Sequence, residues 1–382
     1  MKSNKIRLGE QCVVTSSKRF HLSERITQGV PFYCSKEIIK KFNGEDVTEC
    51  DYISEDLYKK VSNEFGVPKE NDLLITTRGT IGIPYLYKRT DRFYFADGNL
   101  TWIKDFDSNL YSKFLYYWFQ SYEGRKKFEA LAKGTAQKAV PISGIKTLEI
   151  ELPSLKSQKR IADILSAYDD LIENNQKQIK LLEEAAQRLY KEWFVDLCFP
   201  GHENTKIVDG VPEGWSRALL KELISVNYGK DHKKAPDDGN IPVYGSGGLM
   251  RKCNKSLFSG EAVLIPRKGS LNNIMYVDET FWTVDTMFYA TMKQPHTAIF
   301  VYFFVKAFDM YSMNIGAAVP SMTTKILDAM DVVIPDKETL EKFDKLTKTY
   351  FNKIKTLQGQ NERLKTARNL LLPKLMSGEV EV

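Results

Sequence analysis

The strongest constraint on this 382-residue chain is an internal repeat, because each half opens with a mixed, aromatic-rich segment and closes with a long amphipathic stretch. Three short sequences recur in the second half in the same order. The matched pairs are Gly29-Val30-Pro31-Phe32-Tyr33 with Asn240-Ile241-Pro242-Val243-Tyr244, Leu74-Ile75-Thr76-Thr77-Arg78-Gly79-Thr80 with Leu264-Ile265-Pro266-Arg267-Lys268-Gly269-Ser270, and Glu151-Leu152-Pro153 with Val333-Ile334-Pro335. Their offsets fall from 211 (242 − 31) to 190 (269 − 79) to 182 (335 − 153), so loops differ in length while the order is kept. The repeat predicts two copies of one structural unit.

The repeat also predicts the domain organisation and the fold class. We expect a globular domain over residues 1–152, a long helix over 153–199, a second globular domain over 200–335, and a second long helix with a C-terminal tail over 336–382. Short apolar runs between turns predict strands in both globular domains. Each domain also has one aromatic-rich helical stretch, Leu110 to Phe119 and Thr297 to Phe308, whose aromatic side chains we expect mostly in the core. The predicted class is α+β, in which mixed α/β domains alternate with two long antiparallel coiled-coil helices in a pseudo-two-fold repeat.

Composition excludes several classes of protein. Hydrophobic residues make up 42% of the chain and charged residues 27%, as in an ordinary globular protein. The longest apolar run, Ala298 to Val305, is too short to cross a bilayer, and no apolar signal region follows Met1, so we expect a cytoplasmic protein with no membrane contact. Five scattered cysteines and four dispersed histidines indicate reduced thiols and no metal site.

Two stretches have the periodicity of coiled-coil helices. Every seventh residue of the first stretch gives Ile161, Tyr168, Asn175, Leu182 and Leu189, and every seventh of the second gives Phe343, Tyr350, Leu357, Leu364 and Leu371. The single polar member of these two seams, Asn175, could fix the register of the pair. Because a whole domain lies between the two helices in the sequence, they can pack antiparallel.

The apolar stripe on the first helix is wider than a two-stranded coiled coil can cover. Leu165, Ile172 and Ile179 flank the seam, and Tyr190, Trp193 and Phe194 crowd one end. Either other subunits cover the remaining stripe or the globular domains of this chain do. The crowded aromatic end favours a partner, so these six residues are the predicted partner-binding residues.

Basic residues cluster in loops at corresponding places of the two halves. Lys18 and Arg19 lie in the first half, and Lys230 begins the basic run that continues to Lys234 in the second. The overall net charge of +6 permits a polyanion partner but does not require one. A single such cluster is often solvated surface, but recurrence at equivalent places favours contact with phosphate.

A basic residue, a glycine and a hydroxyl residue follow a predicted strand in each half. These are Arg78-Gly79-Thr80 and Lys268-Gly269-Ser270, the latter preceded by Arg267. A cation, a free N–H group and a hydroxyl could converge there on a phosphate or base edge, although a purely structural turn is the alternative. Further candidates are Lys133, Gln137 and Lys138 in a glycine-containing loop, and Ser246 in a glycine-rich turn.

These features together resemble the specificity subunit of type I restriction-modification systems. The resemblance covers essentially the whole chain. The segments that carry it are Glu151-Leu152-Pro153-Ser154-Leu155-Lys156-Ser157-Gln158-Lys159-Arg160-Ile161-Ala162, Leu189-Tyr190-Lys191-Glu192-Trp193-Phe194-Val195-Asp196, Val211-Pro212-Glu213-Gly214-Trp215, Tyr244-Gly245-Ser246-Gly247-Gly248, Arg267-Lys268-Gly269-Ser270 and Leu371-Leu372-Pro373-Lys374-Leu375-Met376-Ser377-Gly378-Glu379. One departure is the stretch from Pro31 to Gly79, which is longer than the stretch from Pro242 to Gly269.

The resemblance implies two target-recognition domains, each of which reads one half of a bipartite, asymmetric site in double-stranded DNA. It implies that the two helices separate these domains and dock two DNA adenine methyltransferase subunits, and that the assembly recruits ATP-driven restriction and translocase subunits. S-adenosylmethionine, ATP and Mg are then expected in the partner subunits, and no cofactor is expected in this chain. The residues named above as phosphate or base-edge candidates are the expected DNA-binding residues.

The chain carries no recognisable catalytic motif. There is no Asn/Asp-Pro-Pro-Tyr/Phe run, no phosphate-binding loop, and no acidic-x-Lys signature after Pro236-Asp237 or Pro335-Asp336. We therefore expect a non-catalytic subunit that reads DNA. The alternative is a coiled-coil adaptor whose paired domains bind proteins, and the salt dependence of binding would separate the two.

Overall fold

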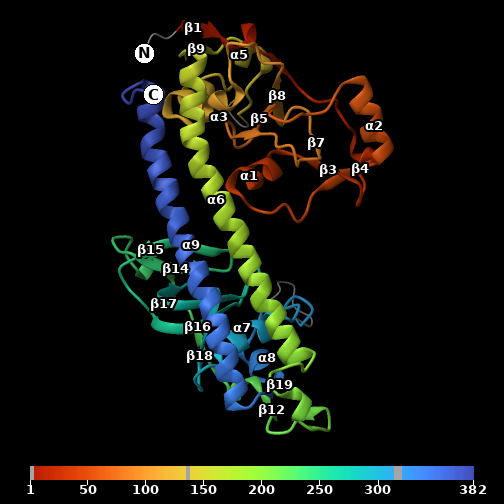
Figure 1. The fold of residues 1–382 in the computed structure, drawn as a ribbon, viewed down its shortest axis with the longest axis vertical. Coiled ribbons are helices and arrows are strands. Elements are labelled where there is room, and N and C mark those ends of the chain that lie inside the picture. Colours follow the sequence, from red (N-terminus) through yellow and green to blue (C-terminus); the bar gives the residue numbers. More distant parts are fainter. Residues whose placement is uncertain (1–3, 135–137, 314–320) are drawn as a thin grey trace. The chain divides into compact units, whose positions relative to one another are not determined.

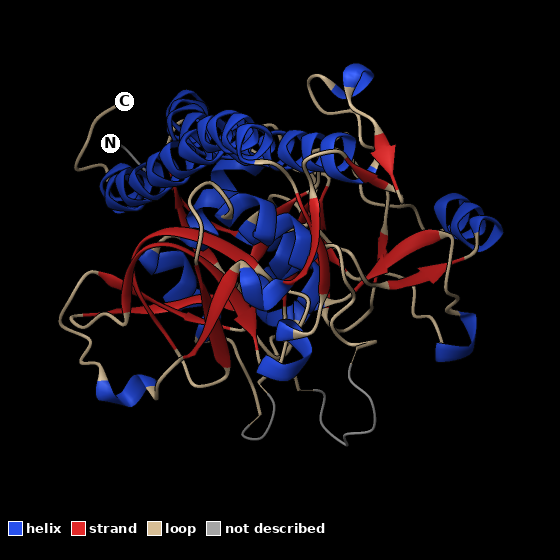
Figure 2. Cartoon of the chain, turned by 90° about the horizontal axis from the view of Figure 1, so that it is seen from below, coloured by secondary structure: helices blue, strands red, loops and turns tan. Residues whose placement is uncertain are grey.

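The computed structural model describes residues 4–134, 138–313 and 321–382, and the chain divides into two compact units. The first unit comprises Met1–Lys177 and Leu357–Val382, and the second comprises Gln178–Thr356. Each long helix therefore contributes one part to each unit. The elements are shown along the chain in Figure 1 and by type in Figure 2.

The first unit contains two small sheets and a separate strand pair. The four-stranded antiparallel sheet has the order β2 (Val13–Thr15), β8 (Leu100–Lys104), β5 (Leu73–Thr76), β6 (Pro84–Leu86). The three-stranded sheet has the order β4 (Asp51–Ile53), β3 (Val30–Tyr33), β7 (Tyr94–Phe95), and β1 (Asn4–Arg7) pairs with β9 (Glu149–Leu152). The helices are α1 (Ser35–Asn43), α2 (Glu55–Glu64), α3 (Ser112–Gln120), α4 (Tyr122–Glu129) and α5 (Ile142–Lys146).

The second unit is built around one six-stranded sheet. Its order is β13 (Ile224–Tyr228), β18 (Met287–Met292), β16 (Phe258–Pro266), β17 (Met275–Thr283), β14 (Ile241–Gly245), β15 (Gly248–Cys253). The remaining strand pairs are β12 (Ser216–Leu219) with β19 (Asp331–Ile334) and β10 (Ile207–Val208) with β11 (Val211–Pro212). The helices are α7 (Ala298–Lys306) and α8 (Thr324–Asp328).

Equivalent backbone pairings occur within each unit, which confirms the predicted repeat. The Leu8 N–H donates to the Leu148 carbonyl at 2.9 Å, and the Leu220 N–H donates to the Met330 carbonyl at 2.8 Å. In the first unit β3 and β7 are parallel, with Phe32 opposite Tyr94, and in the second unit β14 and β17 are parallel in the same way. The two globular parts thus share one topology despite their different lengths.

The two predicted long helices are present. Helix α6 (Leu155–Tyr190) ends in a π-helical turn from Lys191 to Val195, and α9 spans Lys337–Ser377. Helix α9 includes Pro373 close to its C-terminus. A proline there leaves most of the helical hydrogen bonds intact because few turns follow it.

Within the first unit the paired parts of α6 and α9 are antiparallel. The buried Asn175 side chain donates to the Asn361 carbonyl oxygen at 2.9 Å, and Arg368 pairs with Asp169, so a step back along α6 is a step forward along α9. Asn175 therefore has the buried, paired position that a register-setting residue requires. In the second unit, the π-helical turn at the end of α6 contacts α9 through aromatic rings. The centre of the Trp193 ring system lies 5.9 Å from the centre of the Phe343 ring.

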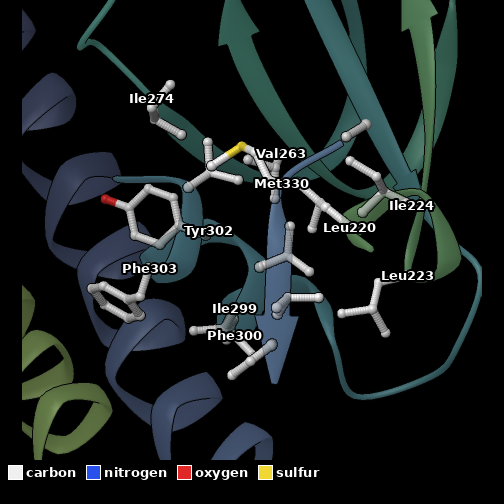
Figure 3. Packing of buried hydrophobic residues seen from close by; sticks show 14 of the residues in the cluster. Leu220, Leu223, Ile224, Val263, Ile274, Ile299, Phe300, Tyr302, Phe303 and Met330 are labelled. Atoms are coloured by element: carbon white, nitrogen blue, oxygen red, sulfur yellow. The ribbon is translucent and has the colours of Figure 1, made fainter. Parts of the chain in front are cut away.

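The aromatic helices α3 and α7 supply core residues, as expected. Phe114, Tyr117 and Trp118 are buried in the first unit, and Phe300 and Phe303 are buried in the second. Figure 3 shows α7 side chains converging with residues of β13, β16 and the turn that precedes β19.

Four of the six predicted partner-binding residues of the first long helix and its π-helical turn are buried within this chain. Leu165, Ile172, Tyr190 and Trp193 are 0%, 7%, 8% and 5% exposed, and Ile179 and Phe194 are half-buried. The globular part and the α9 segment of each unit cover the wide stripe, so the alternative interpretation is correct for the four buried residues. The large apolar side chains that stay exposed on the long helices are Leu171, Leu181, Leu346 and Leu370, with Val195 in the π-helical turn.

None of the helices in the described part of the chain is long and apolar enough to cross a membrane.

Candidate nucleic-acid interface

In the first unit, two of the predicted loops come together beside the end of β5. Arg78 forms an isolated bridge with Ala139, and the Val140 N–H donates to the Thr77 carbonyl at 2.9 Å. Lys133 pairs with Ala139 through two backbone hydrogen bonds of 2.9 and 3.0 Å. The exposed cations Arg78 and Lys133 are therefore carried by backbone segments that are hydrogen-bonded to each other.

A hollow of about 310 Å³ lies at this junction. Its lining includes Ser16, Arg78, Asp97, Gly98 and Lys133. Lys138 is exposed beside Ala139, whereas Gln137 lies outside the described residues. Three of the predicted DNA-binding residues, Arg78, Lys133 and Lys138, thus belong to one region of the first unit.

The second unit has the same turn in the same backbone setting. Lys268 bridges to Ser321, and the Met322 N–H donates to the Arg267 carbonyl at 2.9 Å, as Val140 does to Thr77. The Arg267 and Lys268 N–H groups both donate to the Thr286 carbonyl, at 2.8 and 3.2 Å. The two basic turns are therefore structural equivalents.

Both turns need their glycine for its backbone conformation. Gly79 has a φ of 75° and Gly269 a φ of 84°, in the left-handed region that favours glycine. A Cβ on Gly79 would meet nothing within 4 Å, but a Cβ on Gly269 would lie 2.5 Å from the Ser246 Oγ. The predicted residue Ser246 thus packs directly on the second basic turn. Thr80 and Ser270 are exposed beside their glycines.

The early basic loops also occupy matching places. The Lys18 N–H donates to the Tyr94 hydroxyl at 2.9 Å, and the Trp282 indole N–H donates to the Lys230 carbonyl at 3.0 Å. Tyr94 and Trp282 are equivalent because they pair with β3 and β14 in the same register. Lys18, the neighbouring Arg19 and Lys230 are all exposed.

No described acidic side chain neutralises the cations of these loops and turns. Among the described residues no ion pair involves any of the seven, which are Lys18, Arg19, Arg78, Lys133, Lys230, Arg267 and Lys268. The Lys18 ammonium lies 4.7 Å from the Phe65 ring centre, and the Arg267 guanidinium lies 5.5 Å from that of Tyr228. An unpaired, exposed cation can bind an anion without first breaking an ion pair.

Sequence reasoning missed an acidic residue next to each basic turn. Asp97 and Asp285 are exposed and follow the strands that carry Tyr94 and Trp282. A fourth repeated sequence would have revealed them, since Phe93-Tyr94-Phe95-Ala96-Asp97 matches Phe281-Trp282-Thr283-Val284-Asp285 at an offset of 188 (285 − 97).

A polar network in the second unit was also missed. The carboxylate of the buried Asp344 in α9 lies 2.7 Å from the His296 Nδ1 and 3.0 Å from the Lys348 Nζ. The Lys348 Nζ also lies 3.3 Å from the carboxylate of Glu261 in β16. Burial alone would lower the pKa of Lys348, but the hydrogen bonds and charges of Asp344 and Glu261 outweigh it and raise the pKa. This network fastens α9 to the sheet of its own unit.

The described residues contain no group of His, Cys, Asp and Glu side chains that could hold a metal ion. Fold and site together define a protein with two related units, each presenting one basic turn on a mixed α/β scaffold.

The family model for the type I restriction modification DNA specificity domain matches residues 3–184 and 212–366. The chain belongs to this family of type I restriction-modification specificity subunits, which confirms the resemblance found in the sequence. The relatives of this chain are specificity subunits, which are non-catalytic.

Individual relatives extend the similarity over most of the chain. The type I restriction enzyme MjaIX specificity subunit of Methanocaldococcus jannaschii is 27% identical over 312 residues, which cover 71% of this chain and 69% of the relative. The MjaVIII specificity subunit of the same organism is 23% identical over 361 residues, covering 85% and 83%. A crystal structure of the type I restriction-modification S subunit from M. genitalium superposes with a TM-score of 0.61 at 18% identity, covering 98% of this chain and 96% of that one, and shares the fold.

Proposed function

We propose that this chain reads a bipartite, asymmetric site in double-stranded DNA, with each unit reading one half of the site. The observation that carries the proposal is the duplicated basic turn. Arg78 and Lys268 are exposed, are free of ion pairs among the described residues, and lie in turns closed by the same backbone pairing. Two equivalent cationic sites on two related units suit two contacts along one polyanion.

The surroundings of the two turns differ, which favours unlike half-sites. Ser246, at the tip of the β14–β15 hairpin, packs on the turn of the second unit. In the second unit, a tight turn joins β14 to β15. In the first unit, helix α1 stands at the corresponding place, between β3 and β4. Base readout depends on side chains positioned by such neighbouring segments, so one shared turn can serve two sequences.

We further propose that the chain lends its specificity to two methyltransferase subunits and to restriction and translocase subunits, in which S-adenosylmethionine, ATP and Mg would act. The exposed apolar residues of the long helices are the proposed docking residues. They are Leu171 and Leu370 in the first unit and Leu181, Val195 and Leu346 in the second. Exposed large apolar side chains on helices are favourable sites for burial against a partner.

The test is the salt dependence of DNA binding by the complex of this chain with its methyltransferase subunits. The logarithm of the affinity should fall linearly with the logarithm of the salt concentration. Arg78→Glu or Lys268→Glu should weaken binding and reduce the slope by about one each, because one phosphate contact is lost. Lys206→Glu is the matched control, because Lys206 is exposed and lies outside both turns.

Two results would overturn the proposal. If both turn variants bind DNA as tightly as the Lys206→Glu control, the turns do not contact DNA. If the wild-type complex shows no salt-dependent DNA affinity at all, the adaptor that binds only proteins becomes the better account.

A further inference from the structure

Each basic turn has an acidic neighbour whose presence on a DNA-binding surface needs an explanation. We propose that Asp97 and Asp285 are specificity-determining residues, each accepting a hydrogen bond from the exocyclic amino group of a base in the major groove. The inference rests on the proposed function and goes further, because it assigns one base contact to each unit. Cytosine N4 is the preferred donor, since carboxylate side chains characteristically accept from it.

The two carboxylates occupy equivalent positions. The residue before each is held by the same hydrogen bond, from the Ala96 N–H to the Tyr33 carbonyl at 2.8 Å and from the Val284 N–H to the Tyr244 carbonyl at 3.0 Å. The chain then turns and hydrogen-bonds to the basic turn. Asn99 accepts from the Thr77 N–H at 2.9 Å, and Thr286 accepts from the Arg267 N–H at 2.8 Å. These backbone hydrogen bonds therefore hold the aspartate of each unit next to its basic turn.

Neither carboxylate forms an ion pair with the cations of the adjacent basic turn among the described residues. Arg78 and Asp97 line the same 310 Å³ hollow, yet no ion pair within 4.0 Å joins Asp97 to any described cation. The Ser16 hydroxyl donates to one Asp97 carboxylate oxygen at 2.7 Å. The Arg267 guanidinium donates to the backbone carbonyl of Asp285 at 3.5 Å, and among the described residues nothing donates to the Asp285 carboxylate itself. Gly98, next to Asp97, has a φ of 73° and open space where a side chain would stand. Both acids are thus exposed and able to accept further hydrogen bonds.

The chemistry of DNA restricts what such a carboxylate can contact. Phosphate oxygens repel it, and every backbone group of the duplex is an acceptor at best. The amino-group donors that base edges offer are those of cytosine and adenine in the major groove and of guanine in the minor groove, and carboxylates characteristically accept from cytosine N4. A cation that binds phosphate next to an acid that binds an amino group would combine positioning with base readout in one small turn.

The experiment uses the chain in complex with its methyltransferase subunits and a library of duplexes in which every position of the methylated motif is randomised in turn. Asp97→Ala and Asp285→Ala are compared with wild type and with the exposed control Asp238→Ala. Each variant should lose about ten-fold discrimination at one base pair of one half-site, as expected for one lost base contact. Asp97→Ala should affect one half-site and Asp285→Ala the other.

A second variant separates base reading from a supporting role. Ser16→Ala removes the 2.7 Å hydrogen bond and leaves the Asp97 carboxylate in place, so base preference should stay unchanged. If Ser16→Ala reproduces Asp97→Ala, or if the aspartate variants lower methylation equally at all sequences, the inference is wrong while the proposed function stands. If the wild-type complex itself selects no bipartite motif, the proposed function fails first.

Discussion

The two units have the same order of strand pairings, but their strands differ in length. In the second unit the continuous strand β17 pairs with β16 and also, further along, with β14. In the first unit two short strands share this task, because β6 pairs with β5 and β7 pairs with β3. From Tyr85 to Tyr94 the chain advances nine residues (94 − 85), but from Met275 to the equivalent Trp282 only seven (282 − 275). Two extra residues are enough to break one strand into two.

The segment between β6 and β7 of the first unit is held in place by polar contacts of Asp91. Asp91 accepts from the Tyr85 hydroxyl at 2.7 Å and forms an ion pair with Lys41 of α1 at 2.8 Å. Helices α1 and α2 account for the longer first half, where the second unit has the short β14–β15 hairpin. The difference teaches that the basic turn is fixed by the shared sheet pairing, while its neighbours are free to vary. Four sets of variants test this account, and three of them compare equivalent positions of the two units.

The largest effect is expected where the second unit joins its helices through aromatic rings. Phe343 is fully buried, with the Phe194 ring 4.8 Å away, so Phe343→Ala should cost about 3–5 kcal/mol. The equivalent residue of the first unit, at the repeat offset of 182, is the buried Ile161, and Ile161→Val should cost about 1 kcal/mol. Urea denaturation of the two variants measures both. Equal, small losses would show that the aromatic cluster is not the main contact between the helices of the second unit.

The polar seam of the first unit should give the next largest effect. Asn175→Ala leaves the buried Asn361 without its partner and should cost about 1–3 kcal/mol. Replacing both residues by leucine should restore most of the lost stability but weaken the control of register. Denaturation of the single and double variants provides the cycle. A single variant as stable as wild type would contradict a register-setting role.

The two glycines of the basic turns should respond unequally to alanine. Both have positive φ, so each Gly→Ala change should cost about 1–2 kcal/mol through backbone strain. At Gly269 the new Cβ would also press on Ser246, whereas at Gly79 there is open space. Gly269→Ala should therefore be the more destabilising variant and should weaken DNA binding more. Thermal unfolding and DNA titration of both variants would settle the order, and the reverse order would refute the close packing of Ser246.

The smallest effect concerns the N-terminal caps of the two long helices. Asp336 accepts from the Thr339 N–H at 3.0 Å, and Ser154 accepts from the Ser157 N–H at 3.2 Å. Loss of either cap should cost about 1 kcal/mol at neutral pH. Burial acts to raise the pKa of Asp336, but hydrogen bonds from Thr339 and Trp215 outweigh it and hold the pKa below its usual value.

The two caps should differ in their pH dependence. Since the folded-state pKa of Asp336 is below the unfolded value of about 3.9, its contribution is present above that pH and is lost as pH falls through the folded pKa. The Asp336→Ala effect should thus shrink in acid, while the Ser154→Ala effect stays constant because a serine does not titrate. Denaturation between pH 3 and 7 checks this, and two parallel pH profiles would contradict it.

Much of this architecture could be predicted from the sequence because the repeated segments occur in the same order in both halves. The order of elements followed from the repeated segments, and both long helices followed from the seven-residue periodicity. The core role of the α3 and α7 aromatics followed from the usual burial of such side chains. Asn175 was identified as a seam residue, but its partner Asn361 was not, because a count of sevens from Phe343 passes through Leu357 and Leu364. A two-helix seam alternates steps of three and four, so half of its positions lie off that count.

The sequence could not predict which elements cover the helix stripe, whereas the acids that flank the turns were overlooked although a repeated motif contains them. Leu165 and Trp193 looked available to a partner because periodicity reports an apolar face and not its occupant. Asp97 was missed because the motif that contains it is dominated by aromatic core residues. The cover of the stripe depends on tertiary packing, which local patterns do not encode.

The most direct test of the central claim is methylation profiling of genomic DNA from cells that express the neighbouring methyltransferase with and without this chain. The account predicts that adenine methylation at one bipartite, asymmetric motif is present only with the chain. It also predicts that Arg78→Glu and Lys268→Glu each reduce that methylation, while Lys206→Glu does not. An unchanged methylome, with the complex shown to be expressed and assembled, would contradict the reading of DNA by these two units.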